Sequence, residues 1–459
     1  MILPVDFETR TKQLLGDEYT DLAKALETDA PVSVRINNAK GMTPPDAEPV
    51  PWSEAGYYLA DRPTFTFDPL FHAGCYYVQE AASMFLEKAV KTYIDNPVRC
   101  LDLCAAPGGK STHLLGILPE GSLLVSNEVI RSRSVVLAEN IAKWGMAGSV
   151  VCNNDPAEIG KLTHYFDVIV TDVPCSGEGM FRKDVASRDE WSEANVQLCA
   201  ARQRRIIHDI WDALKPGGLL IYSTCTYNAE ENEDNIEYIT RELGAEVLDV
   251  PTDTSWSIHG AVKGNMPVYR FMPHRTKGEG FFLAVLRKAE GEFSPIKIRA
   301  KKDKQDKKAP SIPTAINDWL NDAKVFHTAV HNGVVEAFPI DYKDDYLLLT
   351  DRLHIVSAGV RVGEIKGKDL VPHPALGLST ALNRDVFTQV DVIWEDAIRY
   401  LRKEAFALPT EIAKGYVLIT YQGYPLGFAK HLGNRANNLY PQEWRIRTSY
   451  TPDEVKTLL

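Results

Sequence analysis

The chain has 459 residues, of which 44% are hydrophobic and 25% charged, which is typical of a folded globular protein with several domains. Its start lacks the basic and apolar segments of a signal peptide, and no apolar run approaches the roughly 18–20 residues of a membrane helix, so we expect a cytoplasmic protein without membrane contact. Seven cysteines, without a CxxC pair or a zinc-spaced His cluster, argue against a disulfide framework and a metal site, and the net charge of −11 argues against nonspecific coating of nucleic acid but is compatible with a local basic groove.

Residues 1–95 are predicted to form an α+β extension. A strand is predicted at 31–37 (PVSVRIN), and a Pro-rich loop follows it at 42–52. An amphipathic helix is predicted before that strand, because apolar residues recur at helical spacing at Leu14, Leu15, Tyr19, Leu22 and Leu26.

Residues 96–290 alternate between strands and helices. Apolar runs predict strands at 98–106, 122–128, 149–154, 166–173 and 217–225, and a closing strand at 280–288. Before the fifth strand, a helix is predicted with Ile206, Ile207, Ile210, Trp211 and Leu214 on its apolar face, ending at Pro216-Gly217-Gly218. This alternation predicts a Rossmann-like α/β domain with a doubly wound parallel sheet.

The rest of the chain is predicted to contain a linker and two smaller domains. Residues 291–310 include the lysine-rich run KIRAKKDKQDKK, which is typical of a solvated tether. An intermediate domain is predicted at 311–405. Residues 406–459 contain short strands and turns, as in GYVLITYQGYPLGFAK, and are predicted to form a small β domain.

A glycine-rich turn, DLCAAPGGKST (102–112), joins the first strand of the α/β domain to a helix, where backbone amides can hold an anionic or polar ligand. A P-loop NTPase is a weaker alternative, because Cys104 stands where the first glycine of GxxxxGK[ST] should be. The GxGxxG pattern of dinucleotide sites is also missing from this turn. We therefore favour S-adenosylmethionine, with its amino-acid end against the turn.

Two acidic residues at the ends of successive strands support a nucleoside pocket. Glu128 ends the second strand, where a carboxylate can accept both ribose hydroxyls. Asp155 follows the third strand and could meet the adenine amino group. Either acid alone would more often be an ordinary surface residue, but the pair favours a nucleoside ligand.

Two cysteines follow the fourth and fifth strands: Cys175 in VPCSG and Cys225 in YSTCTY. Ligands of open α/β sheets bind outside the carboxyl ends of the strands, so we expect both thiols to reach one crevice. A single free cysteine would more often be a small buried apolar residue. Two at matching strand ends, one of them close to Asp172, favour a catalytic role.

A thiol beside a methyl donor suits methylation of carbon 5 of cytosine. A thiolate that adds to carbon 6 turns the ring into an enamine, whose carbon 5 can then take up the methyl group. The proton on carbon 5 must then leave and the enzyme sulfur must be expelled, a step that a second thiol could assist. Asp172 could hold the pyrimidine edge, and Lys110 could favour the thiolate or orient the base. This chemistry does not settle which cysteine is the nucleophile.

Four motifs resemble those of the Sun/Nop2 family of RNA cytosine-5 methyltransferases and occur in the same order: YYVQEAASM, DLCAAPGGKST, TDVPCSGEGM and YSTCTYNAEENE. The resemblance covers about residues 1–290 and implies a class I S-adenosylmethionine-dependent methyltransferase fold. It implies that Cys225 is the nucleophile and that Cys175 assists release, with Asp172 and Lys110 as further catalytic residues. It places the cofactor at Cys104, Ala105, Ala106, Pro107, Gly108, Gly109, Lys110, Glu128, Arg133, Asp155 and Asp172.

The end of the chain resembles the PUA-like RNA-binding domain of the bacterial RsmF (YebU) group, which methylates a cytidine in the decoding region of 16S rRNA. Its basic residues suit phosphate contacts: Lys430, His431, Arg435, Arg445 and Arg447. Arg35 matches a family position near the RNA-binding N-terminal region. We therefore expect a monomeric 16S rRNA cytosine-5 methyltransferase that acts on rRNA or the 30S subunit. The alternative is a non-catalytic rRNA-binding assembly factor with the same fold.

Overall fold

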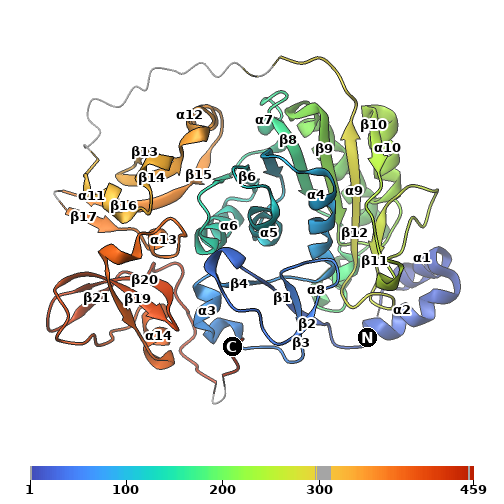
Figure 1. The fold of residues 1–459 in the computed structure, drawn as a ribbon. Coiled ribbons are helices and arrows are strands. Elements are labelled where there is room, and N and C mark those ends of the chain that lie inside the picture. The colour runs from blue at the N-terminus through green and yellow to red at the C-terminus, as the bar shows by residue number, and fades with distance from the viewer. Residues whose placement is uncertain (1–2, 295, 297–311, 368, 453–454, 459) are drawn as a thin grey trace.

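A nine-stranded sheet forms the centre of the molecule in the computed structural model, which describes residues 3–294, 296, 312–367, 369–452 and 455–458 (Figure 1). Its strand order is β10-β12-β9-β8-β5-β6-β7-β15, and β11 pairs with β12. The strands are β5 (Arg99–Asp102), β6 (Leu123–Asn127), β7 (Ser149–Cys152), β8 (Phe166–Asp172), β9 (Leu214–Thr224), β10 (Ala245–Leu248), β11 (Tyr269–Phe271), β12 (Phe281–Lys288) and β15 (Ile355–Ala358).

Strands β5 to β9 are parallel, and helices cover both faces of the sheet. Neighbouring residues of one strand enter different cores: Cys100 faces α4 (Leu86–Tyr93), α5 (Gly109–Ile117) and α6 (Arg131–Trp144), whereas Leu101 faces α7 (Pro156–Ile159), α9 (Glu193–Ile210) and α10 (Glu233–Leu243). Burial on both faces explains why these strands read as continuous apolar runs. The predicted doubly wound α/β sheet is therefore confirmed.

The end of one predicted helix is wrong. The helix before β9 ends at Ile210 and is followed by the 3-10 turn Trp211–Ala213, whereas Leu214 already belongs to β9. Pro216, Gly217 and Gly218 lie inside this strand, where the pairing with β8 is irregular. Gly217 has a φ of 73°, which suits an irregular strand start as well as a helix stop.

The N-terminal extension consists of two helices and a small sheet. The predicted helix is divided into α1 (Val5–Leu15) and α2 (Tyr19–Leu26) at Gly16, whose φ is 58°. The sheet has the order β2-β3-β1-β4, with β1 (Val32–Ile36) close to its predicted position. The other elements are β2 (Glu48–Pro49), β3 (Gly56–Leu59), α3 (Pro69–His72) and β4 (Tyr76–Val78).

Two four-stranded sheets follow in the C-terminal part. The first contains β13 (Phe326–His331), β14 (Val334–Pro339), β16 (Val360–Lys366) and β17 (Asp369–Pro372), and the second contains β18 (Thr388–Asp391), β19 (Gly415–Tyr421), β20 (Tyr424–His431) and β21 (Ala436–Asn438). The helices here are α11 (Ala315–Trp319), α12 (Lys343–Arg352), α13 (Pro374–Gly377) and α14 (Trp394–Leu401).

The proposed boundary between residues 405 and 406 divides the last sheet, because β18 pairs in parallel with β19. The segment 311–405 is not self-contained either, since its strand β15 pairs with β7 at the edge of the central sheet. Both pairings join segments that are far apart in the sequence, so local patterns gave no sign of them. The predicted linker at 291–310 lies largely outside the described residues.

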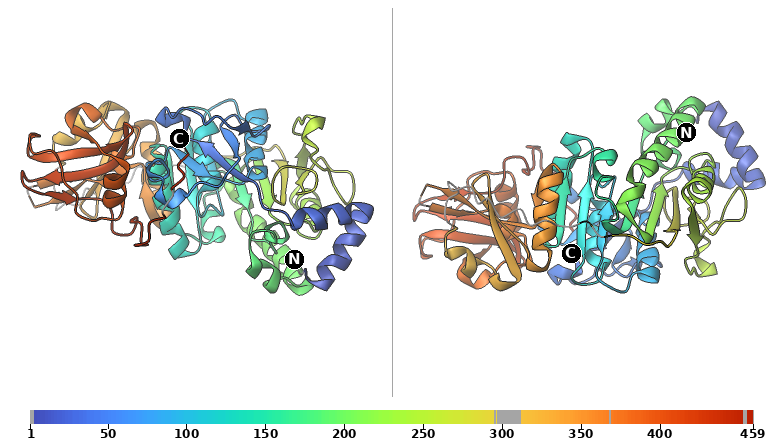
Figure 2. Two further views of the ribbon diagram at one scale, coloured as in Figure 1. Left: turned by 90° about the horizontal axis from the view of Figure 1, so that it is seen from below. Right: turned by 90° about the horizontal axis from the view of Figure 1, so that it is seen from above.

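The N-terminal extension and the C-terminal part share one apolar core. Val34 and Leu70 pack in the same cluster as Ile398 of α14 and Val417 of the last sheet. Figure 2 shows the last sheet and helices α1 and α2 at opposite ends of the molecule, with the β1–β4 sheet between them. Among the described residues, every helix is too short or too polar to span a bilayer.

Candidate active site

The two predicted thiols meet at the carboxyl end of the central sheet. β8 and β9 are parallel neighbours whose register pairs Asp172 with Ser223. Cys175 follows β8 and Cys225 follows β9, and their sulfur atoms lie 3.2 Å apart. Both are free, partly exposed thiols. The structure therefore brings together the two cysteines that matching strand ends had singled out.

The contact between the sulfurs affects the acidity of Cys175. Hydrogen bonding to Cys225 and burial raise the pKa of Cys175 well above its ordinary value. Cys175 is thus a protonated thiol at neutral pH, and it can donate its S–H to a thiolate at position 225.

Asp172 and Lys110 form an ion pair beside the sulfurs. Lys110 Nζ lies 2.8 Å from Asp172 Oδ2, and Ser223 Oγ donates to Asp172 Oδ1 at 3.0 Å. Burial opposes the charge of Lys110, but attraction to Asp172 outweighs it, so the pKa of Lys110 is raised. A negative charge at Cys225 adds to this attraction. The Lys110 ammonium therefore places a positive charge close to the Cys225 sulfur.

The glycine-rich turn is built for close approach of a ligand. Gly108 adopts a φ of 119°, which a residue with a Cβ would rarely tolerate, and it precedes α5. The turn is held from α6, because Arg133 donates to the carbonyl of Ala106 at 2.9 Å and Asn140 donates to that of Pro107 at 2.7 Å. Residues 104–110 therefore form a fixed backbone cradle beside Asp172.

Glu128 and Arg133 lie at the same end of the sheet. Glu128 is 3% exposed, accepts a hydrogen bond from the backbone of Ile130, and lies 3.4 Å from Arg133. Asp155 is exposed, and its carboxylate accepts the backbone N–H of Ala157 at the start of α7. One Asp155 oxygen is thus engaged in capping, and the predicted adenine contact stays a prediction.

Asp102 is a buried acid close to Lys110 and Asp172 that the sequence reasoning missed. It is fully buried at the end of β5, where Ser111 Oγ donates to its Oδ2 at 2.6 Å. Its Oδ1 atom is buried without a hydrogen-bond partner among the described residues. Burial, opposed in part by Ser111, raises the pKa of Asp102 to about 7. The sequence signal that could have identified Asp102 was its position at the start of the glycine-rich motif.

The N-terminal extension supplies one wall of the crevice. A cavity of about 170 Å³ lies between the glycine-rich turn and the segment 77–83, and Lys110 and Asp172 also line it. In this wall, Gln79 Oε1 accepts a hydrogen bond from Arg35, and Glu80 accepts one from the backbone of Glu279. The sequence singled out YYVQEAASM only through its resemblance, so these wall residues had no predicted role.

The prediction that Arg35 contacts RNA is wrong for this structure, because its side chain is only 1% exposed. Its guanidinium donates to Thr112 Oγ1 at 2.6 Å and to the carbonyl of Gly109 at 3.3 Å, and it lies over the Trp144 ring. Arg35 therefore connects the extension to the first turn of α5. The alternating pattern of SVRIN did not reveal this burial, because both faces of β1 are covered.

The basic residues predicted near the end of the chain lie mostly on the surface. Arg435 and Arg445 are exposed, and Lys430 is partly exposed beside the Tyr416 ring. His431 is 2% exposed, with its ring near the carbonyl of Ala413, so it does not belong to this surface.

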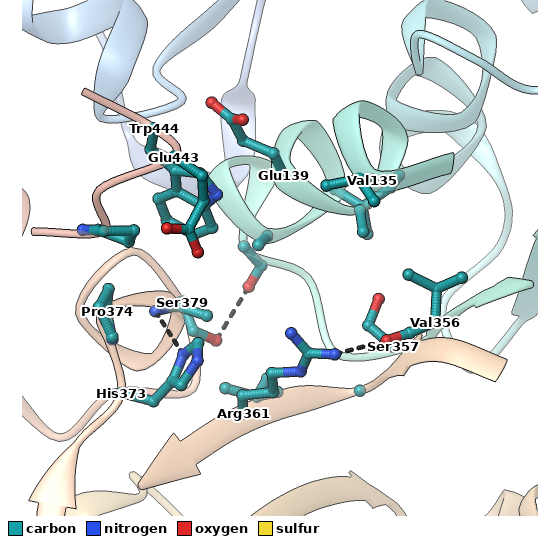
Figure 3. A pocket seen from close by; sticks show the side chains of 18 of the residues that line it. Val135, Glu139, Val356, Ser357, Arg361, His373, Pro374, Ser379, Glu443 and Trp444 are labelled. Atoms are coloured by element: carbon teal, nitrogen blue, oxygen red, sulfur yellow. Dashed lines mark hydrogen bonds between the residues drawn. The ribbon is translucent and has the colours of Figure 1, made fainter. Parts of the chain in front are cut away.

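A larger cavity, of about 380 Å³, lies away from the sulfurs, where α6, β15–β16, α13 and residues 441–444 meet (Figure 3). Glu139, Arg361 and His373 surround it together with Trp444. Neither Lys110 nor Asp172 lines it, whereas both line the smaller cavity, which is therefore the better candidate for catalysis. Within the described ranges, no group of three or more His, Cys, Asp or Glu side chains could hold a metal ion.

Comparison with known families identifies three segments. Residues 93–287 match the model of the 16S rRNA methyltransferase RsmB/F, residues 3–81 match the N-terminal domain of 16S rRNA methyltransferase RsmF, and residues 388–446 match the PUA domain of methyltransferase RsmF. The last match begins at β18, in agreement with the pairing of β18 and β19.

Similar proteins span nearly the same length. The ribosomal RNA small subunit methyltransferase F of Shewanella oneidensis is 31% identical over 89% of this chain and 87% of its own, and that of Aliivibrio fischeri is 30% identical over 95% of both. A methyltransferase homolog from Pyrococcus horikoshii is 27% identical, with a TM-score of 0.54 over 61% of this chain and 94% of its own. NSun6 from the same organism, solved with SFG, shares the fold at 20% identity, with a TM-score of 0.55 over 63% of this chain and 99% of its own.

Proposed function

Because this chain belongs to the RsmF family of 16S rRNA methyltransferases, we propose that it methylates carbon 5 of a cytidine in the decoding region of that RNA, through a covalent bond between Cys225 and carbon 6. The observation that carries the proposal is the pair of sulfur atoms 3.2 Å apart, beside the ion pair of Lys110 and Asp172. Two adjacent ring carbons must react in turn, and this arrangement offers one sulfur for each.

S-adenosylmethionine fits the residues of the crevice. It would supply an electrophilic methyl group, and its sulfonium and ammonium charges suit a region that contains the carboxylates of Glu128 and Asp172 and the buried acid Asp102. The Oδ1 atom of Asp102 is buried and has no hydrogen-bond partner among the described residues, so it could accept a hydrogen bond from a ligand. The archaeal relative solved with SFG, an analogue of this cofactor, supports the same choice. We assign the cofactor to residues 104–110 together with Glu128, Arg133, Asp155 and Asp172.

The two thiols have different tasks in this proposal. Cys225 is proposed to attack as a thiolate, and the Cys175 S–H and the Lys110 ammonium are the groups that lie close to its sulfur. Once its sulfur is bonded to carbon 6, the thiolate charge is gone, and the main cause of the raised pKa of Cys175 disappears with it. Cys175, which is partly exposed, can then release its own proton to solvent, accept the proton from carbon 5, and so allow the Cys225 thiolate to leave.

Asp172 and Lys110 act on the base. The Asp172 carboxylate can accept hydrogen bonds from the amino edge of cytosine, and the Lys110 ammonium pairs with the same carboxylate. The target nucleotide must leave its stack to reach this depth, at a cost of a few kcal/mol.

The terminal parts of the chain are proposed to hold the rRNA. Lys430, Arg435 and Arg445 lie on the PUA unit and can contact phosphates without reading the sequence. The extension formed by residues 1–95 is proposed to position RNA beside the crevice through surfaces other than Arg35.

The test is methyl transfer from a labelled donor to 30S subunits and to free 16S rRNA. Cys225→Ala should abolish transfer and form no adduct, whereas Cys175→Ala should accumulate a protein–RNA adduct that survives denaturing electrophoresis. Cys199→Ala, at a buried cysteine outside the crevice, is the matched control. If both variants trapped RNA in an adduct to the same extent, the roles assigned to Cys225 and Cys175 would be wrong. RNA binding without any transfer by the wild type would favour the assembly factor.

A further inference from the structure

Glu178 connects the loop of Cys175 to the loop of Cys225. It follows Cys175 by three positions and is 3% exposed, in the short helix Glu178–Met180. Its Oε2 atom accepts three hydrogen bonds from the residues just after Cys225: from Thr226 Oγ1 at 2.8 Å, from Tyr227 N at 2.8 Å and from Asn228 N at 2.9 Å. Its Oε1 atom accepts one from Trp191 Nε1 at 3.1 Å. A carboxylate from the first loop thus holds the backbone of the second.

Glu231 makes the reverse connection. It follows Cys225 by six positions and is fully buried, and its Oε2 atom accepts the backbone N–H of Ser176, the residue after Cys175, at 3.0 Å. The same carboxylate accepts from Gln203 Nε2 at 2.7 Å and from Asn228 Nδ2 at 2.8 Å. Between the two loops, the hydroxyls of Ser176 and Thr226 are also in contact at 3.0 Å.

Holding the two loops together with these buried hydrogen bonds lowers the stability of the fold. Every hydrogen-bond partner of both carboxylates named above is a neutral N–H or O–H group, and burial raises the pKa of Glu231. Burying charge in this way costs stability that an apolar contact would not. What hydrogen bonds add is direction, because each fixes a distance and an angle between its groups.

We propose that Glu178 and Glu231 form a reciprocal clamp that sets the distance and relative orientation of the Cys175 and Cys225 sulfurs. Both are positioning residues, and the inference rests on the proposed roles of the two thiols in adduct formation and release. One sulfur must reach carbon 6 while the other serves the neighbouring carbon 5. A loop shift that separates the sulfurs would impair this second task even if each loop kept its own fold.

The test uses Glu178→Gln and Glu231→Gln, each of which places an amide NH2 against hydrogen-bond donors. Glu336→Gln is the control: it changes a buried carboxylate that lies in β14, outside the crevice. The first readout needs neither RNA nor methyl donor. Diamide oxidises two thiols to a disulfide and is itself reduced to a hydrazine, and peptide mapping after alkylation gives the rate at which Cys175 and Cys225 become linked. Titration with a thiol reagent at several pH values corrects this rate for thiolate content.

We expect the wild type and Glu336→Gln to form this disulfide at equal rates and both clamp variants to form it about tenfold more slowly or worse, since small displacements of reacting atoms have large effects. In the second readout, kcat for methyl transfer should fall about 10–100-fold while KM values for RNA and donor change less than about twofold. Loss of activity through general destabilisation would affect Glu336→Gln as well.

Wild-type rates of both disulfide formation and transfer in the two clamp variants would overturn the clamp. If the wild type transfers no methyl group, the proposed function fails, but the disulfide rates still decide the clamp. If a clamp variant does not fold, Thr226→Val replaces it, since it removes one donor to Glu178 and the hydroxyl contact with Ser176. That variant should slow both readouts about three- to tenfold, and unchanged rates would again overturn the proposal.

Discussion

The crevice around the sulfurs and the basic surface of the last sheet are built in opposite ways. In the crevice, Asp172, Lys110 and the two loops are held by buried, directional contacts. On the last sheet, Arg435 and Arg445 project into solvent. Chemistry on a ring needs atoms fixed in place, whereas attraction to phosphates needs charge that can adjust. A substitution in the crevice should therefore reduce turnover, and one on the surface should weaken binding.

Arg35 and Arg435, two of the arginines predicted to contact RNA, show the same contrast within one residue type. Arg35 is enclosed between β1 and α5, where it donates to Gly109 and Thr112, while Arg435 is exposed. Arg35 can reach RNA only if β1 and α5 move apart. Arg35 therefore holds the first turn of α5, whose residues Gly109 and Lys110 line the cavity beside Asp172.

Among the substitutions outside the two cysteines, Asp172→Asn should have the largest effect. The change removes the charge that pairs with Lys110 and a hydrogen-bond acceptor for the base, so kcat should fall about 10²–10³-fold, as when one group that stabilises a transition state is removed. Single-turnover methyl transfer measures this loss. Asp155→Asn is the comparison, at an exposed acid, and should alter only the KM for the methyl donor. A loss below tenfold in Asp172→Asn would show that the ion pair is dispensable.

Arg35→Met should have the next largest effect. It leaves the carbonyls of Gly109 and Thr112 and the Gln79 side chain without their buried donor, which should lower the free energy of unfolding by about 2–4 kcal/mol. The KM for the methyl donor should rise, because α5 opens from the cradle, while RNA affinity should stay within twofold of the wild type. Arg35→Lys should rescue little, since one ammonium cannot replace the planar fork. A selective loss of RNA affinity would restore the original RNA-contact prediction.

Lys40→Met tests the region where three parts of the chain meet. Lys40 Nζ donates to the carbonyls of Ala73 at 2.6 Å, Lys143 at 2.9 Å and Leu378 at 2.6 Å. Loss of these bonds should reduce the free energy of unfolding by about 1–3 kcal/mol with little change in kcat. Denaturant unfolding measures the free energy of unfolding, and methyl transfer measures kcat. Lys324→Met, at an exposed lysine, should change neither the free energy of unfolding nor kcat.

The smallest effect is expected for the double variant Arg435→Ala/Arg445→Ala. Loss of two phosphate contacts should raise the KM for 30S subunits about three- to tenfold and reduce the salt dependence of binding by about two charges, with kcat unchanged. Binding measured between low and moderate salt gives the slope. Lys366→Ala, at an exposed lysine of β16, serves as the control. A fall in kcat at saturating substrate would mean that this surface also helps to place the target base.

By itself, the sequence determined the strands of the central sheet, the glycine-rich turn and the convergence of Cys175 and Cys225 on one crevice. Buried parallel strands are continuous apolar runs, and the ends of such strands share one edge of the sheet, so local patterns contain this information. The resemblance of the motifs and of the final segment added the family, which the comparisons then confirmed.

Only the tertiary structure decided the burial of Arg35, the pairing of β15 with β7 and of β18 with β19, and the exchange of hydrogen bonds through Glu178 and Glu231. Each depends on segments that are distant in the sequence and meet only after folding. A glutamate that will bind a remote backbone N–H looks, in the sequence, like any surface glutamate. Long-range packing fixes its partners, and the local pattern does not encode them.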